Sequence, residues 1–301
     1  LLLLLATAVS GLYWLAEQLY YLPRRREAAI RFDAEWSQRQ TQLASQGITA
    51  KEDESGLLKA REDIIRQPWW LDWTAGLFPV IAAVFVLRSF LYEPFKIPSG
   101  SMIPTMLVGD WLFVNKLRFG PNIPFTSINL PGYAEPSRGD VVVFVSPYQA
   151  DNGDDPTPIL VKRLIGMPGD TIYGREGVVY INGQAQRQGF ASADQTPGDG
   201  TMVAPNFDWQ KPLGLKNTRF GSAPAQPSVD TWGPLVVPPR HFWMMGDNRY
   251  DSKDSRFWGF VPRENVRGRP LFVYYSYVPQ EASDRPVSFL TDIRWSRLGH
   301  M

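Results

Sequence analysis

Two long apolar stretches near the start of the chain constrain its fold more than any other feature. They cover residues 1–22 and 71–92. A helix that crosses the hydrocarbon core of a bilayer needs about 20 predominantly apolar residues, and each stretch reaches that length. Trp69, Trp70 and Trp73 stand at the start of the second stretch, where an aromatic belt would meet the membrane surface. The sequence therefore predicts two transmembrane helices.

Both stretches have alternative interpretations. Ala6-Thr7-Ala8 has the small-x-small form of a cleavage site, so the first stretch could be a removable signal peptide. No basic region precedes this site, however, and the apolar run continues well past it, which favours a membrane anchor. Either stretch could also be a buried core helix. That alternative is weaker, because the two stretches flank an arginine-rich segment.

The segment between the two stretches, residues 23–70, is rich in arginine and lysine. Arg24, Arg25 and Arg26 follow the first stretch directly. Orientation in a membrane follows the excess of Lys and Arg in short cytoplasmic segments. The sequence therefore predicts a cytoplasmic loop here and places everything after residue 92 on the outer side of the membrane.

The sequence pattern changes after residue 92. Short runs rich in Val, Ile, Phe and Tyr alternate with Gly, Pro, Asn and Asp, which favours strands joined by tight turns. Asn182-Gly183 after one such run is a hairpin signal. We therefore expect a mainly β domain made of residues 93–183 and 233–280, with helices confined to the membrane part.

Two later segments lack this strand pattern. Residues 184–232 are rich in Gly, Pro, Ala and Gln, with few apolar residues, and residues 281–301 are polar with isolated aromatic residues. Gly- and Pro-rich segments of this kind form turns and irregular structure. We expect a loop-rich insertion or small subdomain at 184–232 and a C-terminal tail at 281–301.

The composition excludes several kinds of chemistry. The chain has no cysteine, which rules out disulfides, thiolate metal sites and cysteine nucleophiles. Its only histidines are His241 and His300, so a histidine-rich metal site is excluded and a Ser–His–Asp mechanism would depend on one of them. A formal net charge of +1 gives no sign of nucleic-acid binding. Because no metal motif or phosphate-binding glycine loop is present, we expect no cofactor and no metal.

A serine and a lysine are candidates for nucleophilic chemistry. Ser99 and Ser101 lie in a Pro- and Gly-framed segment shortly after the second apolar stretch, where a nucleophile would reach substrates in the bilayer. A serine hydroxyl needs a base, and lysine can serve when burial lowers its pKa. Lys162 stands in an apolar, strand-like run. Lysines in strands are more often solvated than buried, so this run alone favours a solvated lysine.

His241 is the competing candidate for the base. It stands among prolines and aromatic residues with no evident acid partner, which favours a structural role. The polar segment 246–256 alternates charges in a way that is typical of a local hydrogen-bond network.

Four segments, in their order along the chain, resemble the conserved segments of type I signal peptidases. They are SGSMIPT at 99–105, RGDVVVF at 138–144, VKRLIGMPGD at 161–170 and GDNRYDSKDSRFWGFVP at 246–262. Each segment alone is weak evidence for the family. All four in this order, after two apolar stretches, are a highly specific pattern. Tyr250 and Lys253 stand where other residues are common in the family, and we attach no catalytic meaning to that difference.

The resemblance implies a role for each matching residue. It implies Ser101 as the nucleophile and Lys162 as the general base, with Ser99 joining the Ser101 N–H in an oxyanion hole. It implies that Ser252 orients the lysine. The supporting ionic network implied by the resemblance contains Arg163, Asp247, Asp254 and Arg256. Candidate walls of shallow apolar pockets for small substrate residues are Phe95, Ile97, Met102 and Val161.

The activity implied by the resemblance is removal of signal peptides from exported preproteins, with the cut after small residues in the Ala-x-Ala manner. The implied partners are signal peptides, membrane lipid and the export translocon, with no nucleic acid. The implied location is the inner membrane of a bacterium, with the catalytic domain on the periplasmic face.

Three alternatives to this interpretation can be compared with the sequence. Penicillin-interacting Ser–Lys enzymes require Ser-x-x-Lys, and no lysine of this chain has a serine three residues before it. Self-cleaving SOS-response repressors have a related catalytic core, but they are soluble and linked to DNA. A membrane-anchored β-rich binding module without chemistry is the alternative of a different class.

Overall fold

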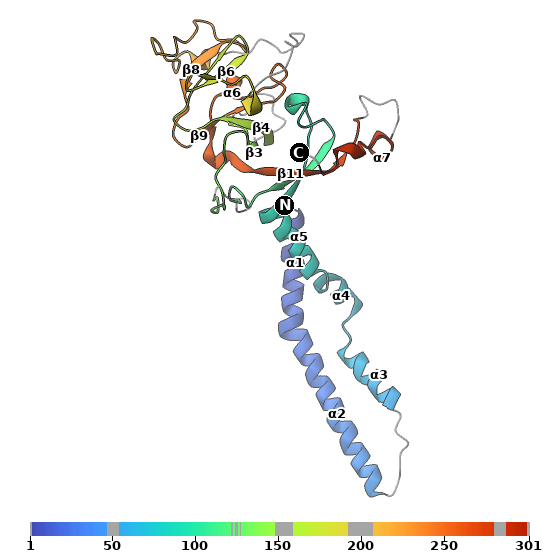
Figure 1. Cartoon of the computed structure of the whole chain (residues 1–301). Coiled ribbons are helices and arrows are strands. Elements are labelled where there is room, and N and C mark those ends of the chain that lie inside the picture. Colours follow the sequence, from blue (N-terminus) through green and yellow to red (C-terminus); the bar gives the residue numbers. More distant parts are fainter. Residues whose placement is uncertain are drawn as a thin grey trace. The chain divides into compact units, whose positions relative to one another are not determined.

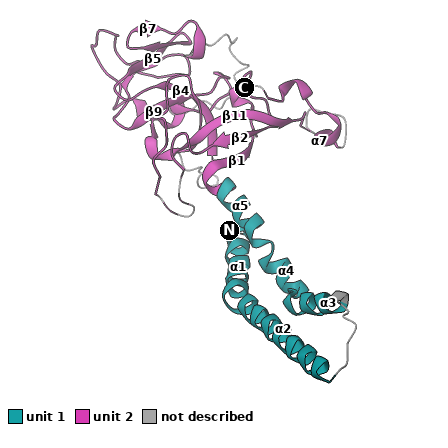
Figure 2. Ribbon diagram, turned by 60° about the horizontal axis from the view of Figure 1, so that its bottom comes forward, with its two compact units in different colours: residues 1–87 teal, residues 88–301 magenta. Residues whose placement is uncertain are grey.

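The computed structural model of the chain divides into two compact units, residues 1–87 and 88–301 (Figure 2). The residues whose structure is described are 2–46, 54–121, 123, 126, 128–147, 159–191, 207–279 and 287–299. The insertion expected at 184–232 and the tail expected at 281–301 lie partly outside these residues, and His300 lies outside them.

Two long apolar helices dominate the N-terminal part of the chain. The first is continuous through α1 (Leu2–Ala16), η1 (Glu17–Tyr21) and α2 (Leu22–Ser45). The second consists of α4 (Trp69–Ala75), α5 (Phe78–Val86) and η2 (Leu87–Leu91). Both are long and apolar enough to cross a membrane, and only 11% and 6% of their most apolar windows are buried. Such exposure does not fit the core helix of a soluble domain, so that alternative is disfavoured.

Within the first unit, the two apolar helices pack against each other. A Cβ on Gly11 would lie 3.0 Å from the ring of Phe78, so the glycine permits this close approach. The ring centroids of Trp14 and Phe78 are 5.3 Å apart, and those of Tyr13 and Trp70 are 6.4 Å apart. A small residue at the closest approach is typical of helix pairs in membranes.

The segment between the apolar helices, which we expected as a cytoplasmic loop, has regular secondary structure in its described part. α2 continues to Ser45, and α3 covers Glu54–Ile65, so most of its described part is helical. The chain from Arg24 to Gln46 contains no Gly or Pro and many residues of high helix propensity, such as Ala, Arg, Gln and Glu. Local propensity therefore extends the helix beyond the apolar stretch.

The second unit is mainly β, which confirms the predicted fold class (Figure 1). Its larger sheet has seven antiparallel strands in the order β1-β2-β11-β3-β4-β9-β10. Their bounds are Tyr92–Lys96 for β1, Asp110–Asn115 for β2, Val141–Val145 for β3, Ile159–Gly166 for β4, His241–Met245 for β9, Val261–Pro262 for β10 and Val266–Ser276 for β11. The last of these strands along the chain, β11, thus lies in the middle of the sheet.

A smaller antiparallel sheet has the order β7-β6-β5-β8. Its strands are β5 (Thr171–Arg175), β6 (Val178–Ile181), β7 (Gln184–Ala185) and β8 (Trp232–Val236). Asn182 and Gly183 join β6 to β7 with φ values of 52° and 90°, which confirms the predicted hairpin turn. Between β7 and β8, the described residues form only the short turns η4 (Gly189–Ala191) and η5 (Asp208–Gln210) and an isolated bridge.

The helices described in the second unit after η2 are short. Besides η4 and η5, they are η3 (Gly100–Met102), α6 (Ser255–Trp258), η6 (Arg263–Asn265), α7 (Ser288–Thr291) and η8 (Trp295–Arg297).

Strand β4 contributes to three separate apolar clusters. Val161 packs with residues of β1, β2 and β3, and Leu164 packs in a cluster around Phe144 and Met244. Ile165 belongs to a third cluster, which joins the smaller sheet to β9. The buried positions of β4 therefore pack against core on more than one side, and a polar side chain at such a position is cut off from water.

Candidate active site

Ser101 lies in the turn η3, a few residues after β1 ends. Next to it, Met102 is 1% exposed and anchors the turn in the apolar cluster of β1 and β2. On the other side, the Asn248 backbone N–H donates to the Ser101 carbonyl at 3.1 Å, and Asn248 Nδ2 donates to the Gly100 carbonyl at 3.2 Å. The serine turn is thus held between the core and the segment 246–256.

Lys162 lies in the middle of β4, opposite Val142 of β3. It is 3% exposed, and its Nζ donates a hydrogen bond to Ser101 Oγ at 2.5 Å. The sequence alone favoured a solvated lysine, and that interpretation is wrong because clusters of apolar side chains surround β4. The structure brings together the two residues that the sequence predicted as a pair.

Burial lowers the pKa of Lys162 from 10.5 to about 8, because desolvation disfavours the charged ammonium. The carboxylate of Asp254 opposes this shift, and the guanidinium of Arg256 adds to it. At pH 7, a pKa of about 8 leaves ~10% of the lysine neutral, against ~0.03% for an unperturbed lysine. A serine hydroxyl therefore lies beside an amine that can accept its proton near neutral pH.

Two further serines were predicted for the site. Ser99 Oγ lies 3.5 Å from Ser101 Oγ. Ser252 is 1% exposed, and its Oγ has no hydrogen-bond partner among the described residues. A Cβ on Gly246 would lie 2.1 Å from Ser252 Oγ and 2.5 Å from the Ser101 carbonyl oxygen, so both serines approach this glycine. The Ser252 hydroxyl is next to the serine turn, but it makes no bond to Lys162 here.

The next residue of β4, Arg163, forms the first part of the ionic network. It binds Asp247 in a bidentate manner, with Nε–Oδ1 and Nη2–Oδ2 distances of 2.7 and 2.6 Å. It also donates to the Gly139 carbonyl at 2.8 Å. The Thr105 hydroxyl donates to Asp247 Oδ2 at 2.5 Å. These bonds tie the strand of the lysine to the segments on either side of the serine turn.

Asp254 and Arg256 form the second part, a wholly buried ion pair. They are 0% and 2% exposed, and Nη2–Oδ2 and Nε–Oδ1 distances are 2.8 and 2.9 Å. Burial raises the pKa of the Asp254 carboxyl, but Arg256 and the Gly246 N–H outweigh it and hold this pKa below its usual value. Arg256 also donates to the Arg249 carbonyl at 2.6 Å. The pair fixes the 246–256 segment, which in turn holds Ser101.

The sequence interpretation assigned no individual role to three residues that hold this site. Asn248 binds the serine turn, and Thr105 binds Asp247. Arg249 is buried and donates to the Gly246 carbonyl at 3.0 Å, and desolvation lowers its pKa to about 10. All three lie in segments that resemble conserved segments of type I signal peptidases. The sequence therefore indicated the importance of these segments, but not the roles of the individual residues.

The four candidate walls of a substrate pocket lie in one cluster. Ile97, Met102 and Val161 are at most 7% exposed, and the partly buried Phe95 packs on them. They therefore form apolar core directly beneath the serine turn, and their role toward a substrate stays a prediction.

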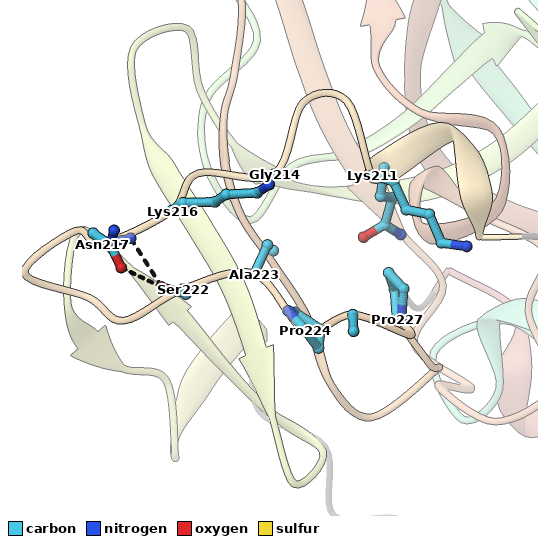
Figure 3. Close-up of a pocket in the computed structure, with 11 residues that line it drawn as sticks. Lys211, Gly214, Lys216, Asn217, Ser222, Ala223, Pro224 and Pro227 are labelled. Carbon is cyan, nitrogen blue, oxygen red and sulfur yellow. Dashed lines mark hydrogen bonds between the residues drawn. The ribbon is translucent and has the colours of Figure 1, made fainter.

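Other groups lie apart from the Ser–Lys pair. The His241 ring hydrogen-bonds to the Pro239 carbonyl at 2.8 Å, which suits the predicted structural role. A cavity of about 410 Å³ in the insertion is lined by residues between Gln210 and Gly233, with Asn217 and Ser222 hydrogen-bonded at its edge (Figure 3). None of its lining residues belongs to the predicted site. Among the described residues, no group of His, Asp and Glu could hold a metal ion.

A serine hydroxyl beside a buried lysine is an arrangement that can support the nucleophilic chemistry of serine peptidases. Comparison with known proteins agrees with this class. The family model "Signal peptidase, peptidase S26" matches residues 70–275. The chain therefore belongs to the signal peptidase family, and it is a serine peptidase.

Individual relatives support this assignment. Signal peptidase I of Pseudomonas fluorescens is 33% identical over 298 residues, and that of Pseudomonas aeruginosa is 32% identical over 297 residues. Each match covers 95% of this chain and 95% of the relative. A crystal structure of a signal peptidase I from Enterococcus faecalis V583 is 28% identical, covers 45% of this chain and 96% of that chain, and superposes with a TM-score of 0.27. Because that superposition is weak, the assignment depends on the sequence matches.

Proposed function

We propose that this protein removes signal peptides from exported preproteins, with Ser101 as the nucleophile and Lys162 as the general base. The observation that carries the proposal is the 2.5 Å contact between Lys162 Nζ and Ser101 Oγ, made by a lysine that is only 3% exposed. The relatives named signal peptidase I supply the substrate class.

The proposed reaction has two stages. Neutral Lys162 takes the proton of the Ser101 hydroxyl while Oγ attacks the carbonyl carbon of the scissile bond. The resulting oxyanion is stabilised by the Ser101 N–H and the Ser99 hydroxyl, and such donors typically contribute about 3 kcal/mol each. Protonated Lys162 then gives its proton to the leaving amine, and an acyl-enzyme remains. In the second stage, Lys162, neutral again, takes a proton from a water whose oxygen attacks the acyl carbon. The bond from this carbon to Ser101 Oγ then breaks, Lys162 returns the proton to Oγ, and the signal peptide leaves as a carboxylic acid.

Ser252 has a place in this cycle as a positioning residue. Its buried Oγ is unpaired among the described residues while Lys162 donates to Ser101. When Lys162 turns its lone pair toward the serine proton, its own N–H groups need an acceptor, and a hydroxyl can supply one. This accounts for an unpaired hydroxyl in a site where most polar groups are bonded.

We further propose that the two apolar helices anchor the protein in the inner membrane and that the β domain faces the periplasm. Their length and hydropathy support spanning, and the Lys/Arg-rich segment between them supports the orientation. Cleavage after small residues is the specificity expected from the resemblance to signal peptidases, with the apolar residues beneath the serine turn as the proposed walls of the pocket. The translocon remains an expected partner on the basis of the substrate alone.

Cleavage of a model preprotein by the purified full chain tests the proposed function. The new N-terminus should follow an Ala-x-Ala segment, and replacement of its last alanine by a bulky residue should stop cleavage. A serine-reactive inhibitor should label Ser101, and Ser101→Ala should remove both labelling and turnover. A β-rich binding module would show neither reaction.

The pH dependence of cleavage should follow the proton on Lys162. Because only the neutral amine acts as a base, kcat/KM should rise about tenfold per pH unit on the acid side and level off above about pH 8. The measurement is kcat/KM for a peptide substrate without titrating groups. An inflection near pH ~6.5 that disappears in His241→Ala would instead favour a histidine base.

Replacing Gly246 with alanine should disable the site while leaving the rest of the fold in place. The added Cβ would lie 2.1 Å from Ser252 Oγ and 2.5 Å from the Ser101 carbonyl oxygen, so the serine turn must move. A displacement of ~1 Å costs about 100-fold in kcat/KM. Gly169→Ala is the control: its Cβ meets nothing within 4 Å, and it bears only the backbone strain of a φ of 86°. Similar kinetics for the two variants would contradict this prediction.

A further inference from the structure

A cavity lined by arginines lies next to the ionic network but contains neither Ser101 nor Lys162. Its volume is about 470 Å³, and Arg118, Arg163 and Arg269 line it together with Asn115 and Tyr133. No aspartate or glutamate is among the residues that line it. We call it the arginine cavity.

Its three arginines differ in how their charge is compensated. Arg163 binds Asp247, and Arg269 Nη1 lies 3.1 Å from Asp140 Oδ1. In the described part of the chain, Arg118 has no ion pair, and its Nε is buried without a hydrogen-bond acceptor. A buried guanidinium N–H without an acceptor is unfavourable. The arginine cavity therefore has one positive charge in excess and a donor that an anion would satisfy.

Asn115 organises the other donors. Its Nδ2 donates to the Tyr133 hydroxyl at 3.1 Å, so the hydroxyl proton of Tyr133 is directed to another acceptor. Its Oδ1 accepts the backbone N–H of Arg118 at 3.2 Å. A planar guanidinium with a neighbouring hydroxyl donor suits a phosphate, whose oxygens accept several hydrogen bonds at once.

The place of the arginine cavity in the sheet suggests where a phosphate would come from. The second apolar helix ends at Leu91, and the next residue, Tyr92, lies opposite Asn115 in the β1–β2 register. On the other side of β2, Arg269 also lies opposite Asn115. Neighbouring strands are about 4.8 Å apart, so the cavity begins one strand away from the residue at which the chain leaves the helix.

Exposed apolar side chains accompany these arginines. Leu271 lines the cavity and is 40% exposed, its neighbour Phe272 is also 40% exposed, and Tyr133 is 67% exposed. Apolar side chains around a basic cavity fit the boundary between lipid headgroups and acyl chains, where phosphates and apolar surface are found together.

We propose that the arginine cavity binds the phosphate of an anionic phospholipid such as phosphatidylglycerol, with Arg118 as its main ligand and Arg269 and Tyr133 as further donors. This proposal rests on the membrane anchoring proposed above, but not on the identity of the peptide that is cleaved.

Native mass spectrometry of the full chain, released from neutral detergent micelles, tests this proposal. The micelles contain equal amounts of phosphatidylglycerol and phosphatidylcholine. The wild-type chain should retain phosphatidylglycerol about tenfold over phosphatidylcholine, and Arg118→Gln should remove most of this preference. Arg187→Gln is the matched control, because Arg187 is exposed in the insertion and the charge change is the same. Arg118→Lys keeps the charge but loses the planar guanidinium group. Its preference for phosphatidylglycerol should therefore lie between that of the wild type and that of Arg118→Gln.

Several outcomes would overturn the proposal. One is equal retention of phosphatidylglycerol and phosphatidylcholine by the wild-type chain. Another is an equal loss of the lipid preference in the Arg118 and Arg187 variants, because it would indicate a diffuse charge effect. Displacement of the lipid by millimolar inorganic phosphate or by an acidic peptide would assign the cavity to that ligand instead.

Peptide cleavage by the same samples shows that each variant is folded. If Arg118→Gln does not fold, Tyr133→Phe serves as the second variant. It too should weaken the preference for phosphatidylglycerol. Normal cleavage without lipid preference refutes this inference alone, whereas absent cleavage by the wild type refutes the proposed function.

Discussion

Replacing Lys162 with methionine should abolish cleavage and at the same time stabilise the β domain. Methionine has a similar length but no charge, so it removes the proposed base and the cost of burying an ammonium. Loss of a residue that acts in both stages of a covalent mechanism lowers kcat by about 10⁴-fold or more. The pKa of Lys162 is lowered from 10.5 to about 8, which corresponds to an unfavourable free energy on the order of 3 kcal/mol in the folded state.

The gain in stability should depend on pH in a way that identifies its cause. Below about pH 8, Lys162 is charged in both states, and the folded protein bears the full cost of burial. Between pH 8 and 10.5 the folded state releases the proton first, so this cost shrinks, and it disappears above 10.5. The stabilisation by Lys162→Met should therefore be largest at neutral pH and fade toward pH 10.5.

Urea unfolding of the full chain in detergent, followed by tryptophan fluorescence, measures this effect. Lys216→Met is the matched control, because Lys216 is exposed and its replacement should change the free energy of unfolding little at any pH. A Lys162→Met variant that still cleaves at a useful rate would refute the base assignment. A gain that is constant with pH would refute the desolvation argument.

Removing Arg256 should be the most damaging single change in the ionic network. Arg256→Met would leave the Asp254 carboxylate, which is 0% exposed, without its cation. An unpaired buried charge costs about 3–5 kcal/mol of stability. The loss should also reach the active site, because Asp254 binds the Gly246 N–H at 3.0 Å and Gly246 adjoins the Ser101 carbonyl.

The deficit of Arg256→Met should shrink as the pH falls. Without Arg256, burial raises the pKa of Asp254 above its unfolded value, and protonation at acid pH removes the buried charge. The control is Lys211→Met, which breaks the exposed Lys211–Asp208 pair and should cost less than about 1 kcal/mol. Equal losses in the two variants, or a deficit that grows in acid, would argue against the buried-charge explanation.

Sequence reasoning reached the Ser–Lys pair through resemblance and missed the burial of the lysine. Lys162 stands in a strand with one apolar and one charged neighbour, a pattern compatible with a half-exposed strand. What decides its burial is that three clusters meet at β4, and these come from segments far apart in the sequence. Burial at this position depends on tertiary packing, which local pattern does not contain.

The same limit explains the elements whose type or extent was not foreseen. β1 contains Glu93, Pro94 and Lys96, which argue against a strand, but it lies at the edge of the sheet, where proline is tolerated. β11 begins at Val266, within a run that contains Arg, Gly and Pro. Its pairing with both β2 and β3 makes this run a strand. Where propensity was strong, as in the Asn182-Gly183 turn, local sequence was sufficient.

The central position of β11 also bears on when the enzyme becomes active. β2 and β3 follow one another along the chain, yet β11 separates them in the sheet. This sheet can therefore not be completed before β11 has been synthesised, because β11 pairs with both β2 and β3. The Asp254–Arg256 pair that fixes the serine turn also emerges late. The order of strands thus delays formation of the folded β domain until its last long strand has been made.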